Sequence, residues 1–565
     1  ERDLLTTDGD GFAASKMLPY GRYTVHQTAG EEGKALIPDF TVFISSNGQT
    51  YSYILNNRTI TARLKVEKCD AETGNIIPVP GTGFQVKDLS TGEFVTQEIY
   101  YPNPETLDTF YVSDEGWLML PEPLHTGDYE LYEVAAPYGY VLSSEPVPFT
   151  IDGSESVVTV TQHNMPQKGQ LTITKTGEVF ASVQENDGLY QPVYEVMGLP
   201  GAVYDVIADE DIYTGDGTLR AAKDTVVETL TTGEDGTAAS GLLYLGRYRL
   251  EERQAPAGMV LNSQPEYAEL TYAGETVEVT QIVVGLYDER QKVAVSLSKE
   301  LETDELFGLG MNEEYKDISF GLYASADLTA LDGSVIPAGG LLEVVSVDPD
   351  EAGSYYVKER TTNSAYILSD TEYPVVFEYA GQDAALVQIL VNEGEPISND
   401  LLRGRVDGVK VGENPEGGDD VKLSGALIGL FQPDTEEFTE ENALLTVTTG
   451  EDGSFAFENI PYGHWIVKEI SAPALYTVSQ EQHHIYIGVD GQSIEIRVEN
   501  TLIRGGVQVM KTEAVDEPSP VEKENEDKNT FLRFLSGAVF DLYEDTNGSK
   551  ELDSEDKKLG TLKEA

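Results

Sequence analysis

Three residue types that could join covalently recur along the chain in a fixed order. Each round opens with a lysine at the end of a short apolar strand, continues with a glutamate that follows an aromatic residue, and closes with asparagine or aspartate. The lysines are Lys68, Lys175, Lys299, Lys410 and Lys511. The glutamates are Glu133, Glu252, Glu359 and Glu469, and the closing residues are Asn57, Asn164, Asp288, Asn392 and Asn500.

These residue types could form an amide bond between two side chains. A lysine amine is a nucleophile only when it is neutral, and burial among apolar side chains favours the neutral form. Such an amine can attack the side-chain carbonyl of asparagine with loss of ammonia, or that of aspartate with loss of water. A buried, protonated glutamate can donate a hydrogen bond to the carbonyl oxygen and shuttle protons. Folding supplies the proximity, so the reaction needs no separate enzyme and no cofactor.

The same residues also have ordinary structural roles. Lysines at strand ends are often solvated, a nearby glutamate can form a simple ion pair, and asparagines after strands commonly make turns. For one isolated set, this structural interpretation is the better one. Recurrence of all three residue types in one order favours bond formation in the sets that close with asparagine.

Short β-strands must position these residues. Apolar and polar residues alternate, as in Leu171–Lys175 and Val507–Lys511, and glycine-rich turns separate the segments. One unit recurs at a period of about 100 to 125 residues. The closing residue precedes the next lysine by eleven positions in four cases, and only the step from Asn392 to Lys410 is longer, by seven residues.

Further motifs stand at fixed places in each unit. A strand with small and apolar residues follows the lysine, as in Gly201–Tyr204, and a later strand runs from an aromatic residue to the glutamate, as in Tyr129–Glu133. Three copies continue into Ala-Pro, for example Ala136–Pro137. This ordered set resembles the SpaA/CnaB-type prealbumin-like domain, which builds pilus shafts and adhesin stalks in Gram-positive bacteria. The resemblance covers nearly the whole chain.

The resemblance implies an all-β chain of tandem prealbumin-like (reverse immunoglobulin-like) β-sandwich domains in an elongated rod. Each domain is expected to be a seven-stranded sandwich whose first and last strands lie side by side and are locked by an intramolecular isopeptide bond. We expect complete repeats at 62–166, 167–290, 291–401 and 402–503, the second half of a repeat at 1–61, and the first half of another at 504–565.

By position, the resemblance assigns four bond-forming sets, in which the glutamates act only in bond formation. The second set departs from the pattern because its aspartate adds a charge that must be neutralised on burial. Asn57 and Lys511 belong to the truncated repeats, and Gln27 stands where a glutamate would precede Asn57. The sets are Lys68, Glu133 and Asn164; Lys175, Glu252 and Asp288; Lys299, Glu359 and Asn392; and Lys410, Glu469 and Asn500.

Composition excludes several classes of function. The 565 residues carry 99 Asp and Glu against 37 Lys and Arg, a formal net charge of −62, which repels phosphate backbones and anionic lipids. We therefore expect no nucleic-acid binding. The sequence contains no apolar run long enough to span a bilayer, so we expect no membrane insertion in this fragment. The single cysteine, Cys69, excludes an intrachain disulfide.

Other candidate sites are weak. Asp545, Asn547 and Asp553 lie in an acidic loop that partly resembles a calcium loop, but Lys550 stands where such a loop needs glycine, so a solvated hairpin is the favoured interpretation. The sequence has no nucleophile elbow, phosphate loop or zinc-type spacing. We therefore expect a protein that is not an enzyme and that binds no metal or cofactor.

These observations predict a structural stalk of a bacterial cell-surface protein, either a pilus shaft subunit or an adhesin stalk. It is expected outside the cell, anchored to the cell wall through parts beyond this sequence, with other surface or pilus subunits and a host ligand as partners. The alternative is an adhesin module that recognises a host protein or glycan through loops at the sandwich ends. The aromatic stretch Ile99–Pro102 is a candidate for such a loop.

Overall fold

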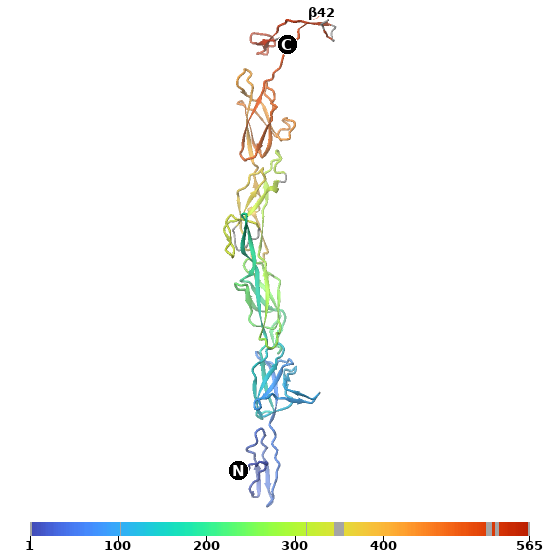
Figure 1. Ribbon diagram of the computed structural model, residues 1–565, viewed down its shortest axis with the longest axis vertical. Coiled ribbons are helices and arrows are strands. Elements are labelled where there is room, and N and C mark those ends of the chain that lie inside the picture. Colours follow the sequence, from blue (N-terminus) through green and yellow to red (C-terminus); the bar gives the residue numbers. More distant parts are fainter. Residues whose placement is uncertain are drawn as a thin grey trace. The chain divides into compact units, whose positions relative to one another are not determined.

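The chain is built almost entirely of β-strands (Figure 1). The computed structural model describes residues 3–562 except 102, 312–313, 344–354, 516–522 and 526–529. In these residues the helical elements are the short 3-10 turns η1 (Glu314–Asp317) and η2 (Val391–Gly394). No helix in the described ranges is long and apolar enough to cross a membrane. The all-β prediction is confirmed.

The chain divides into two compact units, which we describe separately. The first comprises residues 1–300, 315–362 and 368–398, and the second 301–314, 363–367 and 399–565. We call the structures within the predicted complete repeats the first sandwich (62–166), second sandwich (167–290), third sandwich (291–401) and fourth sandwich (402–503). Ahead of them, β1 (Gly21–Val25) and β2 (Phe40–Ile44) form an antiparallel pair.

The first sandwich has two sheets. In one, β3 (Thr61–Asp70) lies parallel to β12 (Val157–Asn164) and antiparallel to β8 (Trp117–Met119) and β9 (Leu124–His125). The facing sheet has the order β11-β10-β4-β7. Its strands are β4 (Gly83–Asp88), β7 (Phe110–Tyr111), β10 (Gly127–Ala135) and β11 (Val147–Ile151). The hairpin of β5 (Gln97–Ile99) and β6 (Glu105–Leu107) projects from this sandwich (Figure 1).

The second sandwich repeats this plan. Its first strand, β13 (Lys168–Asn186), lies parallel to its last, β23 (Val279–Asp288), and also pairs with β19 (Thr237–Ala239) and β20 (Leu243–Tyr244). The facing sheet has the order β18-β15-β21-β22. Its strands are β15 (Val203–Ala208), β18 (Val226–Thr231), β21 (Gly246–Gln254) and β22 (Glu266–Leu270), and β16 (Ile212–Tyr213) pairs with β17 (Leu219–Ala221) beside it.

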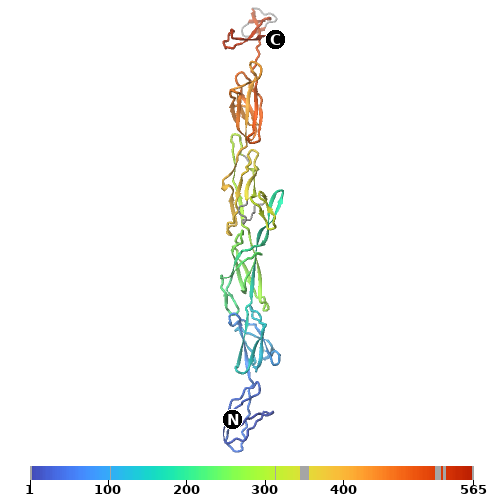
Figure 2. The same cartoon turned by 90° about the vertical axis from the view of Figure 1, so that its left-hand side faces the viewer.

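The third sandwich shares a sheet with the second, which the sequence did not predict. Beyond residue 175, β13 continues and turns back as β14 (Leu189–Gly198), and β14 pairs with β29 (Leu341–Leu342). Figure 2 shows this hairpin, coloured teal, extending beside the strands of the third sandwich, and Figure 1 shows the same arrangement. The other strands are β24 (Lys292–Ser296), β26 (Ser319–Ala324), β27 (Leu328–Thr329), β28 (Val335–Ile336), β30 (Tyr355–Thr361), β31 (Glu372–Val375) and β32 (Leu386–Leu390).

The fourth sandwich lies in the second unit. Here β34 (Arg403–Gly412) is parallel to β41 (Ser493–Asn500) and antiparallel to β38 (Ser454–Pro461) and β35 (Val421–Lys422). The facing sheet has the order β37-β36-β39-β40. Its strands are β36 (Leu427–Phe431), β37 (Leu445–Thr448), β39 (Gly463–Ser471) and β40 (His483–Ile487). The remaining short strands are β25 (Lys299–Leu301), β33 (Ile397–Asn399), β42 (Thr512–Val515), β43 (Lys523–Asn525), β44 (Thr530–Phe534), β45 (Asp541–Glu544) and β46 (Lys557–Thr561).

Each of the four sandwiches has its own apolar core, which contains the aromatic residue four positions before the glutamate. These residues are buried, and in three sandwiches their polar atom donates to the carbonyl four positions earlier: Tyr129 to His125, Tyr248 to Tyr244, and Trp465 to Pro461. Aromatic side chains are best buried when their polar atom finds a partner in this way. In these three sandwiches the hydrogen bond ties the glutamate-bearing strand to the strand that precedes it.

Candidate functional site

Strand alternation carries the lysines into the cores. Successive side chains of a strand point to opposite faces, so Lys68 of β3 lies on the same face as Leu64 and Val66, and all three are fully buried. Lys175 follows Leu171 and Ile173 on β13 in the same way. Lys410 of β34 shares its face with Val406 and is equally buried. Each lysine therefore lies at the end of a buried apolar row.

The first sandwich brings its predicted set together. Lys68 Nζ lies 2.9 Å from Glu133 Oε1, with both side chains fully buried. Asn164 Nδ2 donates to Glu133 Oε2 at 2.8 Å and to Val141 O at 2.6 Å. Phe84 lies beside the amine, with Nζ 5.9 Å from the ring centroid. The glutamate thus contacts both residues that would form the bond.

The fourth sandwich also brings its predicted set together. Lys410 Nζ lies 3.1 Å from Glu469 Oε1, and it donates a short hydrogen bond to Asn500 Oδ1. Asn500 Nδ2 donates to Glu469 Oε1 at 3.0 Å. The parallel pairing of β34 with β41 puts Lys410 opposite Val498, two residues before Asn500. The amine therefore lies against the carboxamide that it would attack.

The second sandwich adds a hydroxyl group to its set. Lys175 Nζ lies 2.8 Å from Glu252 Oε1, forms a short ion pair with Asp288, and donates to Tyr204 Oη at 2.7 Å. Tyr204 faces Glu252 across β15 and β21, where the first sandwich has Phe84 opposite Glu133. Sequence reasoning missed Tyr204, although its alignment with Phe84 was visible.

The third sandwich brings together only part of its predicted set. Lys299 Nζ lies 3.9 Å from Glu359 Oε1 and donates to Ile397 O at 2.9 Å. Asn392 lies in η2 with a positive φ of 55°, and its amide donates to Glu395 O at 3.1 Å. Because Asn392 lies in a partly exposed turn, it lacks the buried environment that its assigned role requires.

Asn399 has that environment instead. Its side chain is buried, and Nδ2 donates to Ile367 O at 3.0 Å, as Asn164 Nδ2 donates to Val141 O. Asn399 also precedes Lys410 by eleven positions, the step found between the other repeats. Asn399 therefore shares a buried side chain and the eleven-residue step to the next lysine with Asn164 and Asn500.

In the truncated leading repeat, the closing asparagine makes the same kind of contacts, but a glutamine replaces the glutamate. Asn57 Nδ2 donates to Gln27 Oε1 at 3.0 Å and to Ala35 O at 2.5 Å, so Gln27 occupies the place of the glutamate. At the other end, the side chain of Lys511 is exposed.

A backbone N–H group orients every one of the four glutamates. In each case Oε2 accepts from the residue ten positions later, at 2.7 to 3.0 Å, which leaves Oε1 facing the lysine. Ile37 donates to Gln27 Oε1 across the same interval. The donors for the glutamates are the backbone N–H groups of Ser143, Asn262, Ser369 and Ser479.

Burial shifts the pKa values of several reacting groups towards their neutral forms. Desolvation lowers the pKa of Lys68 from 10.5 to about 8, against the opposing effect of Glu133, and it also lowers the pKa of Lys299 and Lys410. Burial raises the pKa of Asp288 to about 7, although Lys175 opposes this shift. A neutral amine and a protonated carboxyl are the reactive forms in amide formation.

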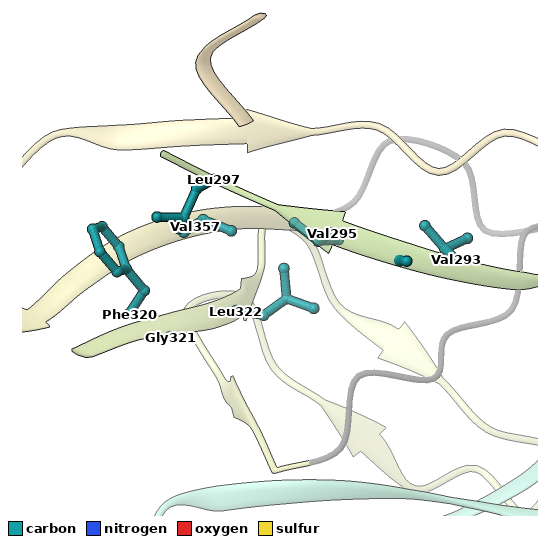
Figure 3. Close-up of a pocket in the computed structure, with 8 residues that line it drawn as sticks. Val293, Val295, Leu297, Phe320, Gly321, Leu322 and Val357 are labelled. Carbon is teal, nitrogen blue, oxygen red and sulfur yellow. The ribbon is translucent and has the colours of Figure 1, made fainter. Parts of the chain in front are cut away.

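Two other features show no comparable chemistry. In the acidic loop, Asn547 Nδ2 donates to Asp553 Oδ2 at 2.7 Å, and Asp545 accepts from the backbone of Ser549, as in a hydrogen-bonded turn. Among the described residues no group of three His, Cys, Asp or Glu side chains could hold a metal ion. A cavity of about 390 Å³ lies in the third sandwich between β24 and the strands β26 and β30, and apolar side chains such as Val295, Phe320 and Val357 line it (Figure 3).

Comparison with known proteins gives a family match. The sequence profile of the SpaA prealbumin-like fold domain matches residues 62–166, 196–283 and 410–502, which is just over half of the chain. Among solved structures, the Bacillus anthracis TIE protein is 17% identical, with 78% of this chain and 74% of that chain covered and a TM-score of 0.42. The search of curated proteins gave no match.

Two solved major pilins are also similar. BcpA of Bacillus cereus is 15% identical, with 60% of this chain and 100% of that chain covered and a TM-score of 0.25. SpaD of Corynebacterium diphtheriae is 14% identical, with 60% of this chain and 98% of that chain covered and a TM-score of 0.18.

Proposed function

The chain belongs to the family of SpaA prealbumin-like fold domains, and from this premise we propose that it is a load-bearing stalk of a bacterial surface protein, as a pilus shaft subunit or an adhesin stalk. The observation that carries the proposal is the buried contact of lysine, glutamate and asparagine or aspartate near the ends of the first and last strands. The stalk acts outside the cell, with other surface or pilus subunits as its partners.

Each buried set forms one isopeptide bond after folding. In the first sandwich the neutral Lys68 amine attacks Cγ of Asn164, an amide C–N bond forms, and the bond from Cγ to Nδ2 breaks. Glu133 passes the proton of the amine to the leaving group, so one ammonia leaves and the glutamate is regenerated. In the second sandwich the acceptor is Asp288 and one water leaves. For the third sandwich we propose Asn399 as the acceptor in place of Asn392.

Such a bond suits a domain under tension. Pulling on the two ends of the first sandwich loads β3 against β12, which are neighbours in one sheet. An amide between Lys68 and Asn164 would carry this load through covalent bonds, so the segment between them could not be stretched out. The chain has a single cysteine and therefore no intrachain disulfide that could serve the same purpose.

Force spectroscopy of the full chain tests this function. The 95 residues between Lys68 and Asn164 would add about 300 Å of length on unfolding, and comparable steps would come from the other sandwiches. We expect no such steps from the clamped sandwiches of the wild-type chain. A variant with Glu133, Glu252, Glu359 and Glu469 replaced by alanine should release them. Full-length steps from every sandwich of the wild-type chain would contradict the proposal.

A second candidate function rests on the β5–β6 hairpin. Tyr100 is 70% exposed and Tyr101 is 88% exposed, and Pro102 of the same stretch lies outside the described residues. Exposed aromatic side chains on a projecting loop are typical of protein and glycan contacts. Binding of the wild-type chain to arrays of host matrix proteins and glycans, lost in a variant with Tyr100→Ser and Tyr101→Ser, would support an adhesin role.

A further inference from the structure

The hairpin of β13 and β14 begins in the second sandwich and ends in the core of the third. It turns at Asp187 and Gly188, whose φ angles of 52° and 78° suit a two-residue hairpin turn. The hairpin is an insertion, because Lys175 and Tyr204 are 29 positions apart whereas Lys68 and Phe84 are 16 apart. The first sandwich has no counterpart of this length.

Backbone pairing joins the hairpin to the third sandwich on both of its strands. On β14, Leu189 and Tyr190 lie parallel to β29, and Tyr190 O accepts from the backbone N–H of Glu343 at 2.8 Å. On β13, the carbonyl groups of Phe180 and Ala181 accept from the backbone N–H groups of Leu331 and Asp332, at 3.2 and 3.1 Å. Because β29 pairs with β26, the hairpin extends the main sheet of the third sandwich.

Side chains of the hairpin complete the third core. Phe180 is buried in the cluster that contains Leu322, Tyr355 and Val357, and Tyr190 packs against the same cluster. Val183 and Tyr194 of the hairpin also pack there. The neighbouring Val179 instead packs against Leu199, Ala255 and Met259 of the second sandwich. The base of the hairpin therefore packs in the second sandwich, and the part from Phe180 to Tyr194 packs in the third.

The linker between the two sandwiches is fixed as well. Arg290 lies over Tyr194 of the hairpin, 3.4 Å from the ring centroid, and bonds Glu178 at 3.2 Å. Gln291 is fully buried and donates to Gly381 O and Ala384 O. In the preceding joint, Gln167 makes the equivalent bonds to Gly274 O and Val277 O. The two joints therefore share the glutamine contact, and the second of them adds the hairpin.

We propose that the hairpin is a built-in strand donor: the third sandwich depends on it to complete its sheet and core, whereas the second sandwich does not depend on the third. A strand added to a sheet edge satisfies backbone groups that an unpaired edge leaves open, and apolar side chains from the donor add to the core. The partner is a neighbouring segment of the same chain. The third sandwich keeps its sheet only while the second supplies the hairpin, and tension passes between them through sheet and core as well as through the linker.

Hydrogen exchange followed by mass spectrometry in the full chain tests the proposal. In Phe180→Ala, exchange should become at least tenfold faster at the backbone amides of β26 and β30 of the third sandwich. It should stay unchanged in β15 and β21 of the second sandwich, even though Phe180 belongs to the second sandwich by sequence. Val196→Ser is the matched control, because Val196 of β14 is 60% exposed, and it should leave every strand unchanged. Equal acceleration in β15 and β26, or no acceleration in β26, would overturn the proposal.

A second variant tests the proposal in case the core of the third sandwich repacks around Phe180→Ala and hides its effect. Shortening the hairpin to the loop length of the first sandwich should abolish protection in β26 and β30. Unchanged exchange in β36 and β39 of the fourth sandwich verifies that the remaining chain is folded. Retained protection of β26 and β30 in the shortened chain would show that the third sandwich is autonomous and would refute strand donation.

Discussion

Glu133 contacts both prospective bond partners of the first sandwich: its Oε1 lies 2.9 Å from Lys68 Nζ, and its Oε2 accepts from Asn164 Nδ2 at 2.8 Å. Glu133→Ala should therefore abolish the bond and leave a buried lysine without its partner. We expect the variant to retain the ammonia that bond formation releases from the wild-type chain. We also expect the free energy of unfolding of the first sandwich to fall by about 3–5 kcal/mol. Denaturing mass spectrometry and chemical denaturation measure the two effects. Glu115→Ala, at an exposed turn of the same sandwich, is the control and should change neither.

Bond formation in the first sandwich should depend on pH through Lys68. Its pKa is about 8, so about half of the amines are neutral at pH 8 and about 1% at pH 6. The rate after refolding should rise about fiftyfold between these values and level off above pH 8. Before reaction, the lowered pKa means that folding stability increases as pH rises from about 8 to 10.5, because the unfolded lysine still binds a proton there. Quenched samples analysed by mass give the rate, and a flat profile would contradict the role of the amine.

The second sandwich should respond to pH in the opposite sense. The pKa of Asp288 is about 7 in the fold, so its protonated, reactive form is present below pH 7 and is lost above it. The unreacted sandwich accordingly loses stability as pH rises from about 4 to 7, because the folded state binds the proton more tightly. Asp288→Asn should exchange loss of water for loss of ammonia and remove this dependence. Peptide mapping across pH 5 to 8 measures the yield of the linked pair of Lys175 and residue 288 in the wild-type chain and in the variant. A wild-type yield that rises from pH 6 to 8 would refute the assignment.

The third sandwich distinguishes two acceptors. Asn399→Ala should prevent loss of ammonia from the third sandwich, whereas Asn392→Ala should leave it intact, because Asn392 lies in a partly exposed turn and Asn399 is buried. Tandem mass spectrometry of the linked peptides that contain Lys299 identifies the acceptor directly. A bond that survives Asn399→Ala and disappears in Asn392→Ala would reverse this assignment.

Much of the fold was readable from the sequence because its signals are local. Alternation of apolar and polar residues identified the strands, and it also explains why Lys68, Lys175 and Lys410 are buried, since each continues an apolar face. The family match confirms the tandem prealbumin-like domains. The sequence predicted Asn392 for the third set, whereas the eleven-residue step to Lys410 and burial of the side chain favour Asn399.

What the sequence could not show depends on contacts between distant segments. The β13–β14 hairpin alternates like any other strand pair, so nothing local distinguishes strands of the second sandwich from strands that complete the third. The backbone N–H groups ten positions after each glutamate are invisible in side-chain patterns, because any residue type could donate them. Tyr204 differs from Phe84 by one hydroxyl group, and its contact with Lys175 becomes evident only when β13 and β15 are packed together.

The intact mass of the unfolded wild-type chain tests the central claim most directly. If the buried sets react, the mass measured under denaturing, reducing conditions should fall below the sum of the residues by one ammonia for each of the first, third and fourth sandwiches and by one water for the second. A mass equal to that of the unmodified chain would show that amine, acid and carboxamide remain separate groups, and the covalent stalk would have to be abandoned.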